Sequence, residues 1–441
     1  MMANDRDALI RAALTPPESV QPPAELADDI YRALVATPQR RAPLGGLPVG
    51  RWLPQRTASL AWLVVLGSLL LAALAILAIA SRPPSILDGV VNFHGNPGLT
   101  GEMPGPGPSG SVAIGWQVAL AGPLTSLNMP LARDGQLVVA DGNGTVTTLD
   151  ARTGQLMWST TGFGSIIGTP VLTAGRIIVA ADDGTVVAID AATGVEGWRR
   201  SIGAPTRAPL AAAGDVALVG SEDGFVHLLD VVSGAELRKV DAGGPVQRSP
   251  AIVDGIAYVG VLGGRVTAFD VPTGTIRWTT ELGEGEVLTP ALTDGILYVA
   301  RGPLDLSEPH EVVALDAADG AIRWRWSGLT VERFFITAVA DGAVFVGSED
   351  HNVYRLDAAI GTGGLFFETE GSVDRLGAIA DGTLYVSSAD RHLYAIDPVS
   401  GVEKWKLEVE GTPTVPVVID GRVVVGTHLG KVVAIEGSST P

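Results

Sequence analysis

Gly184–Trp198, which reads GTVVAIDAATGVEGW, is the clearest copy of a phrase that recurs along this chain of 441 residues. The general form is G-x-V-x-x-[LIF]-D-x-x-[TS]-G-x-x-x-W, and its Asp returns at steps of 40, 40, 40, 46, 41, 40 and 39 residues. A constant period near 40, made of short apolar runs and glycine turns, predicts a β-propeller with one blade per repeat. The acids that mark the eight copies are Asp150, Asp190, Asp230, Asp270, Asp316, Asp357, Asp397 and, as a degenerate last member, Glu436.

The sequence inside each repeat predicts four short strands. In six repeats a proline stands directly before the first strand, as in Thr169-Pro170 and Ser249-Pro250. An Asp-Gly pair follows in most repeats, as at Asp254-Gly255, and supplies the positive φ that a two-residue hairpin turn needs. We therefore predict that each repeat forms one antiparallel sheet.

The two ends of the repeat region complement each other. The last repeat stops at Glu436 without a fourth strand, whereas Trp116 belongs to a fourth-strand sequence that no third strand precedes. We predict that residues 114–120 pair beside residues 431–436 and close the ring, because closure removes exposed sheet edges. The prediction is an all-β fold of eight blades closed by an N-terminal strand.

A tryptophan stands in the fourth strand of most repeats. One large ring per blade at one register indicates packing against the next blade rather than stacking on a ligand. Blade three has Arg238 at this place. The repeat Asp is interpreted as an acceptor that caps a turn, with Thr-Gly or Ser-Gly beside it. The predicted blade-docking residues are Trp116, Trp158, Trp198, Trp278, Trp324 and Trp405.

Charge and cysteine content exclude several classes of function. The chain has no Cys, which excludes disulfides, thiolate metal sites and a lipidated N-terminal Cys. After Arg82 there are 22 Lys and Arg against 42 Asp and Glu, a net charge of −20. Such a domain is repelled by phosphates, so no nucleic-acid partner is expected. No pair of histidines has metal-site spacing, and we expect no catalytic, cofactor or metal residues.

One stretch has the length and composition of a membrane span. Leu60–Ala80 is apolar, and no charge stands between Arg56 and Arg82. We predict a transmembrane helix over 58–81. Arginines concentrate before it, which places the N-terminus in the cytoplasm and the repeats outside the cell membrane. A cleaved signal peptide is the alternative because Ala78-Ile79-Ala80 fits a cleavage site, but 56 residues precede the apolar run.

The remaining segments flank the span and the repeats. Residues 1–57 are predicted to be a cytoplasmic segment with a short helix over 24–37, either a weakly ordered tail or a docking helix for a partner. Residues 82–110 are rich in Pro and Gly and predict a linker that lifts the propeller off the membrane. The propeller covers 111–437, and 438–441 form a tail.

The repeat resembles that of the quinoprotein, or pyrroloquinoline quinone (PQQ), propeller superfamily over about residues 111–437. The motif ALDAxTGxxxW is nearly spelled out by Ala188–Gly194 with Trp198, and again by Ala314–Trp324. One branch of that superfamily consists of eight-bladed alcohol and glucose dehydrogenases that hold PQQ with Ca²⁺. The other consists of BamB-type lipoproteins, which are non-enzymatic eight-bladed scaffolds. The resemblance implies the fold, and the absence of Cys and of an Asp-rich insertion sets this chain apart from the dehydrogenases.

The clearest insertion is Pro303–Glu311, between the second and third strands of blade five. It contains Asp305, Glu308, His310 and Glu311. A long solvated hairpin loop and a metal site are the two interpretations of this insertion, and the loop is the simpler one.

The strand order brings the loops before each first strand to one mouth of the central channel. Three arginines at equivalent ring positions suggest a basic mouth that receives an acidic segment or small anion, because Arg binds carboxylates in bidentate fashion. Solvated loop arginines are the alternative. Glu332, Phe334 and the loop 303–311 lie on the same predicted face. The residues two before the proline position are Asn128, Gly168, Arg207, Arg248, Leu288, Phe335, Arg375 and Thr414.

Two functions follow from the sequence. The first is a membrane-tethered, monomeric propeller that acts as a binding scaffold or sensor for another envelope or membrane protein, with Arg207, Arg248, Arg375 and Phe335 as the partner-binding mouth. The alternative is a PQQ-dependent dehydrogenase of alcohols or sugars.

Overall fold

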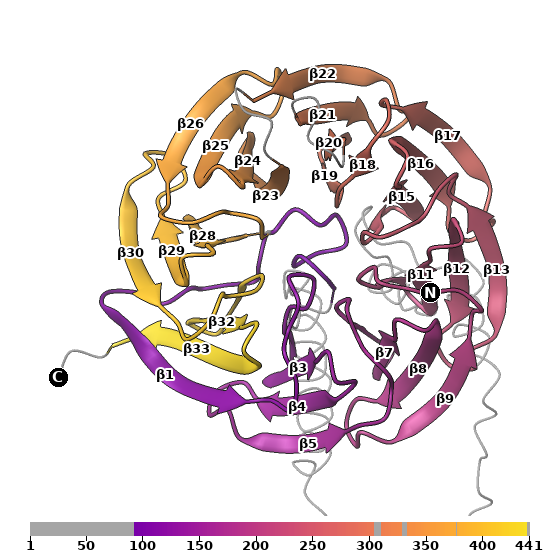
Figure 1. Ribbon diagram of the computed structural model, residues 1–441, viewed down its shortest axis with the longest axis horizontal. Helices are drawn as coiled ribbons and strands as arrows, with labels where there is room; N and C mark the ends of the chain where they lie inside the picture. Colours follow the sequence, from indigo (N-terminus) through magenta and orange to yellow (C-terminus); the bar gives the residue numbers. More distant parts are fainter. Residues whose placement is uncertain (1–91, 304–309, 329–332, 376, 439–441) are drawn as a thin grey trace, which may run out of the picture. The chain divides into compact units, whose positions relative to one another are not determined.

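The protein forms a ring of eight antiparallel sheets around a central axis (Figure 1). The computed structural model describes residues 92–303, 310–328, 333–375 and 377–438. All regular structure in these ranges is β, and no helix within them is long and apolar enough to cross a membrane. The predictions for residues 1–57 and for the span at 58–81 lie outside the described residues. The predicted eight-bladed propeller is confirmed.

The first four blades each contain four strands in chain order from the channel outward. Blade one has β2 (Leu131–Arg133), β3 (Gln136–Ala140), β4 (Val146–Asp150) and β5 (Leu156–Thr160). Blade two has β6 (Val171–Thr173), β7 (Arg176–Ala180), β8 (Thr185–Asp190) and β9 (Glu196–Ser201). Blade three has β10 (Ala211–Ala213), β11 (Val216–Gly220), β12 (Phe225–Asp230) and β13 (Glu236–Asp241). Blade four has β14 (Ala251–Val253), β15 (Ile256–Gly260), β16 (Arg265–Asp270) and β17 (Ile276–Glu281).

Blade five gains a short extra strand and blade eight is shared between the chain ends. Blade five has β18 (Glu286–Val287), β19 (Ala291–Thr293), β20 (Ile296–Gly302), β21 (Glu311–Asp316) and β22 (Ile322–Ser327). Blade six has β23 (Phe334–Ala340), β24 (Ala343–Ser348), β25 (Asn352–Asp357) and β26 (Gly363–Glu368). Blade seven has β27 (Ala378–Ala380), β28 (Thr383–Ser387), β29 (His392–Ile396) and β30 (Glu403–Glu408). Blade eight has β31 (Val417–Ile419), β32 (Arg422–Gly426), β33 (Lys431–Gly437) and β1 (Val112–Ala119).

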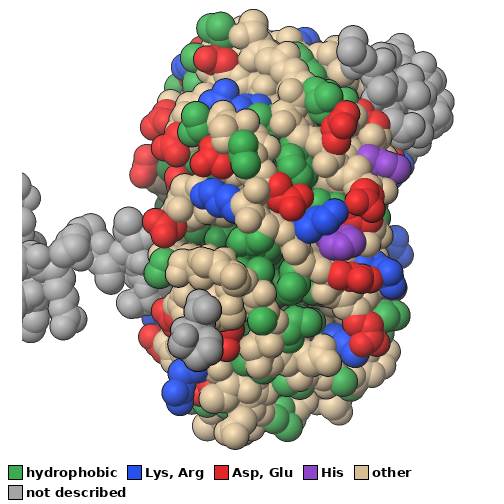
Figure 2. Space-filling view, turned by 90° about the vertical axis from the view of Figure 1, so that its left-hand side faces the viewer, with side chains coloured by type: hydrophobic (Ala, Val, Ile, Leu, Met, Phe, Trp, Pro, Cys, Tyr) green, Lys and Arg blue, Asp and Glu red, His purple; other side chains and the backbone are tan. Residues whose placement is uncertain are grey.

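The burial of each strand follows from its place in the blade. The second and third strands lie between neighbouring blades and are buried on both faces, so β15 and β16 are almost continuously buried. The fourth strand forms the rim, and β9 alternates exposed and half-buried residues. Figure 2 shows this rim with acidic, basic and hydrophobic side chains interspersed.

The ring closes as predicted. β1 pairs antiparallel with β33 from Val112 opposite Gly437 to Ala119 opposite Lys431, with an irregularity between Ile114 and Trp116. The pairing joins residues more than 300 positions apart and leaves blade eight with four strands like its neighbours.

The tryptophans lie in the seams between blades. The indole of Trp158 covers Gly194 of the next blade, and its N–H donates to the carbonyl of Ala191 at 3.2 Å. The indoles of Trp198, Trp278 and Trp324 make the same bond one blade further on, at 2.9 to 3.0 Å. These four rings therefore combine apolar packing with a satisfied polar group, whereas the buried Trp116 N–H has no hydrogen-bond partner among the described residues.

Two blades use other side chains in the same seam. In blade three the aliphatic stem of Arg238 lies over Gly274 of blade four. In blade six, where the repeat pattern is least regular, the ring of Phe366 lies beside Gly401 and 5.5 Å from the ring of Phe345. The seam therefore needs a bulky side chain and not specifically an indole.

The repeat Asp caps the turn between the third and fourth strands. In blade two, Asp190 Oδ1 accepts hydrogen bonds from the Ala192 and Thr193 amides and from the Thr193 hydroxyl, at 2.7 to 3.2 Å. These bonds favour the charged carboxylate and hold the pKa of Asp190 below its ordinary value. The Asp190 carboxylate therefore has a structural role, since it accepts the hydrogen bonds of its own turn.

The predicted linker 82–110 must be corrected for the part that the structure describes. Residues 92–107, here called the strap, run through the channel (Figure 1), and Phe93 and Leu99 are buried. Carbonyls of Pro97, Gly98, Thr100 and Gly101 accept hydrogen bonds of 2.7 to 2.8 Å from amides of Ile252, Leu292, Val339 and Ile379. Composition predicted a spacer because the segment cannot form a core alone. The innermost strands, however, present unpaired amides, and the strap satisfies them.

His94 fixes the strap at the centre of the channel. The side chain is 1% exposed, with Nδ1 2.6 Å from the Leu99 carbonyl oxygen and Nε2 3.0 Å from those of Thr337 and Gly377. A neutral imidazole has one N–H, so one ring nitrogen faces a carbonyl without a proton. Burial outweighs these carbonyls and lowers the pKa of His94.

Gly194→Ala should destabilise the protein more than Gly175→Ala. Both glycines have φ near +70°, so both alanines have the same backbone strain. A Cβ at Gly194 falls 2.7 Å from the Trp158 indole, whereas one at Gly175 meets nothing within 4 Å. We expect an additional loss of about 1–3 kcal/mol for Gly194→Ala. Urea unfolding of the detergent-solubilised chain measures it, and equal midpoints would contradict the seam role.

His94 should make stability fall in mild acid. Its folded pKa lies below the unfolded value of about 6.5, so the stabilisation is complete above pH 6.5 and decreases as pH falls toward the folded pKa. His94→Gln should flatten the dependence of the urea midpoint on pH between about 7.5 and 5.5. His428→Gln, at an exposed position, is the control. An unchanged slope in His94→Gln would refute the assignment.

Candidate functional site

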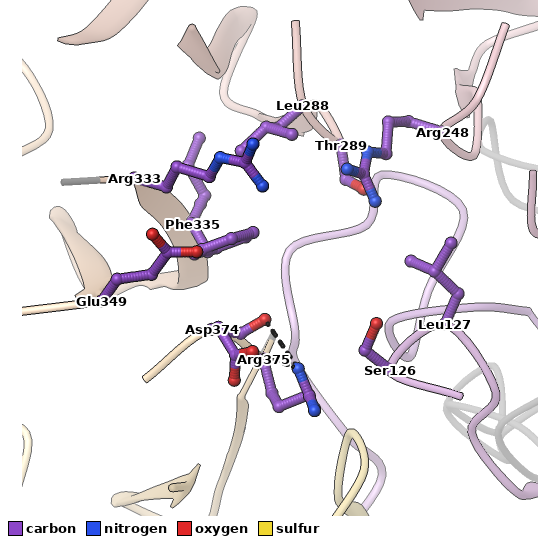
Figure 3. A pocket seen from close by; sticks show the side chains of 11 residues that line it. Ser126, Leu127, Arg248, Leu288, Thr289, Arg333, Phe335, Glu349, Asp374 and Arg375 are labelled. Carbon is purple, nitrogen blue, oxygen red and sulfur yellow. Dashed lines mark hydrogen bonds and ion pairs between the residues drawn. The ribbon is translucent and has the colours of Figure 1, made fainter. Parts of the chain in front are cut away.

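A pocket of about 160 Å³ opens at the mouth of the channel where the loops before the first strands converge (Figure 3). Five blades contribute to it. Leu127 precedes β2, Arg248 precedes β14, Leu288 precedes β19, and Phe335 lies on β23. Asp374 and Arg375 precede β27. The pocket is therefore a property of the closed ring, because no single blade carries more than a few of its residues.

The structure brings together three of the four predicted mouth residues. Arg248, Phe335 and Arg375 line the pocket. Arg207 does not line it, and its Nε lies 2.8 Å from Asp182 Oδ1 on a solvent-exposed part of the surface. Of the other ring positions, Leu288 also lines the pocket. Asn128 is buried and donates to the Gly168 carbonyl, which is a structural role.

Sequence reasoning missed three charged lining residues, namely Arg333, Glu349 and Asp374. Arg333 stands two residues before the ring position of blade six, and Asp374 stands one before that of blade seven. A wider window around each ring position would have included both. Glu349 comes from the turn after β24, and only the fold places that turn beside the mouth.

Most of the arginine charge at the mouth is already paired. Arg248 Nη2 lies 2.6 Å from Oε1 of the buried Glu286, and Arg375 Nη1 lies 2.5 Å from Asp374 Oδ2. Arg333 makes no ion pair with any residue in the described ranges. The basic mouth expected from sequence is thus a nearly balanced set of charges with one unpaired guanidinium.

The insertion of blade five holds a compact ion-pair cluster. Glu311 Oε1 lies 2.5 Å from Arg301 Nη1 and 2.7 Å from Arg325 Nη1, and Arg301 also donates to the Glu284 carbonyl. His310 Nε2 lies 3.1 Å from the Pro303 carbonyl oxygen, and burial lowers the pKa of His310. Asp305 and Glu308 lie outside the described residues. Glu311 and His310 are therefore committed to protein partners.

The described residues of these sites offer no ready set of ligands for the Ca²⁺ that accompanies PQQ. Within the described ranges no three His, Asp or Glu side chains gather in a way that could hold a metal ion. The pocket is also smaller than the roughly 300–1,000 Å³ of typical small-molecule sites.

Eight radial sheets, built from a repeat that in most copies carries an Asp, a turn glycine and a bulky side chain in the fourth strand, define a PQQ-like repeat propeller. The family profile described as "Outer membrane protein assembly factor BamB" matches residues 109–204, 182–293, 262–365 and 308–439. These matches together run from 109 to 439, so the chain belongs to this family. No curated protein matches the chain significantly.

Solved structures with the same architecture include both branches of the superfamily. BamB from Moraxella catarrhalis is 20% identical with a TM-score of 0.62, over 75% of this chain and 99% of that one. A quinohemoprotein alcohol dehydrogenase from Pseudomonas putida HK5 is 13% identical with a TM-score of 0.64, over 80% and 81%. The computationally designed protein Ika8 is 21% identical with a TM-score of 0.61, over 72% and 98%. Likeness at such identities shows the fold alone.

Glu311→Gln should destabilise the propeller by about 3 kcal/mol, because it leaves Arg301 and Arg325 without their counter-charge in a mostly buried cluster. Glu408→Gln is the matched control, since Glu408 pairs with Arg391 on an exposed part of the rim. The control should cost less than about 1 kcal/mol. Urea unfolding measures both, and similar losses would contradict a structural role for the cluster.

Proposed function

We propose that this protein is a membrane-tethered, extracytoplasmic propeller that binds another envelope or membrane protein through the channel-mouth pocket, as a scaffold or sensor module. The observation that carries the proposal is the pocket itself. Five blades build it, and it combines Phe335, Leu127 and Leu288 with charged side chains. Aromatic residues and Arg together are typical of protein-binding sites.

Membership of the BamB family supports a binding role in the envelope. Tethering rests on the apolar run at 58–81 and on the arginines that precede it. The strap adds a physical reason for a tether at this end of the propeller. Because residues 92–107 are hydrogen-bonded to several blades, a force on the preceding chain is distributed over the ring.

The topology can be tested with single cysteines, because the natural chain has none. Val399→Cys places a thiol on a highly exposed turn of blade seven, and Ser19→Cys places one in the N-terminal segment. A membrane-impermeant maleimide should label intact spheroplasts at Val399→Cys and leave Ser19→Cys unlabelled until the membrane is opened. Labelling of both variants, or of Ser19→Cys alone, would refute the proposed orientation.

Partner binding can be tested by site-specific photocrosslinking in intact cells. A photoreactive residue at Phe335 should give a discrete protein adduct, whereas the same residue at Val399, far from the mouth, should not. The adduct should decrease when Phe335 is replaced by Ala in a chain that carries the crosslinker at Ser126, which also lines the pocket. Absence of adducts from both mouth positions would refute the proposed function.

A further inference from the structure

The mouth pocket has balanced charges but an excess of hydrogen-bond donors. A guanidinium has five N–H groups, and a carboxylate pair uses two at most. Arg248 directs Nε and Nη2 at one oxygen of Glu286, and Arg375 directs Nη1 at Asp374. Within the described residues, Arg333 has no side-chain hydrogen bond or ion pair. Several N–H groups of three guanidiniums therefore have no acceptor within these ranges.

These guanidiniums surround one space. Figure 3 shows Arg333 reaching toward the centre of the pocket from one side, Arg248 from the opposite side, and Arg375 from below. The side chains of Arg248 and Arg375 are 21% and 18% exposed, so an anion placed among them is less screened by water than at an open surface. We infer that the pocket receives the carboxylate of an Asp or Glu side chain from a partner polypeptide, with Arg333 as its principal contact.

Asp374 favours a peptide over a free anion. Its Oδ2 binds Arg375, but Oδ1 is buried and has no hydrogen-bond partner among the residues that the structure describes. A buried acceptor without a donor is unfavourable. A peptide that places its carboxylate at Arg333 also brings backbone N–H groups that can donate to Asp374. A small dicarboxylate has no such donor when it is ionised.

The apolar residues that line the pocket indicate which residue of the partner lies next to its acidic side chain. Phe335, Leu288 and Leu127 present apolar surface to the same space. The volume of about 160 Å³ is below that of typical small-molecule sites and suits a single side chain. The matching segment is an acidic residue with a large apolar neighbour. This inference rests on the proposed protein-binding function and names the chemistry of the partner.

The test uses the full-length protein in nanodiscs and two fluorescent acetylated pentapeptides, Ala-Leu-Glu-Leu-Ala and Ala-Leu-Gln-Leu-Ala, followed by fluorescence anisotropy. The Glu peptide should bind about 10-fold more tightly than the Gln peptide, because a charge-assisted pair replaces a neutral contact. Arg333→Gln should remove this difference. Arg207→Gln is the matched control, since Arg207 is a half-exposed arginine at the ring position of another blade and does not line the pocket. Excess glutarate should not displace the Glu peptide.

Three outcomes would overturn the inference. The first is equal affinity for the two peptides, and the second is an equal loss of affinity for the Glu peptide in Arg333→Gln and Arg207→Gln. The third is displacement of the Glu peptide by glutarate at the concentration of the peptide, which would indicate a small-anion site. The Phe335 crosslink separates this inference from the proposed function. If the crosslinked adduct forms equally well in Arg333→Gln, the pocket binds a protein but not through an acidic residue.

Discussion

The antiparallel ladder between β1 and β33 is the constraint on which the rest of the structure depends. It joins the first and last strands of the ring, so that blade eight has four strands and no sheet edge of the rim is left open between the chain ends. Each blade then packs between two neighbours, and the second and third strands are buried on both faces. Without this ladder, the tryptophan seams would form an arc with two exposed faces, and the loops of the five pocket-forming blades would not face one another.

A closed ring creates a second problem at its centre, and the strap solves it. The innermost strands present backbone amides to the channel, and such groups need acceptors where they are buried. Carbonyls of residues 92–107 accept hydrogen bonds from amides of blades four, five, six and seven. The His94 ring in turn contacts the carbonyl oxygens of Thr337 and Gly377. The segment that leads from the predicted span into the propeller is therefore part of its core. Any displacement of the strap must break bonds to several blades at once.

The pocket follows from the same geometry. Thr337 and Gly377, which hold His94, come directly after the segments of blades six and seven that line the mouth. Charges that the repeat places on separate blades are neutralised across the seams, as in Arg248 with Glu286, and the remaining donor capacity concentrates at Arg333. The family relationship and the structural likeness define the architecture, whereas the chemistry of the mouth follows from its individual side chains.

The sequence by itself determined the number of blades, the strand order, the closing strand and the seam residues, because each depends on a local pattern that recurs at a constant period. It also identified Arg248, Phe335 and Arg375 as ring-position neighbours. Only the tertiary structure decided that Arg207 pairs away from the mouth, that Arg333 and Glu349 join it, and that residues 92–107 fill the channel. The physical reason is that these outcomes depend on which unpaired donors and charges lie within a few ångströms of one another. Such distances arise only after eight sheets have closed around a common axis.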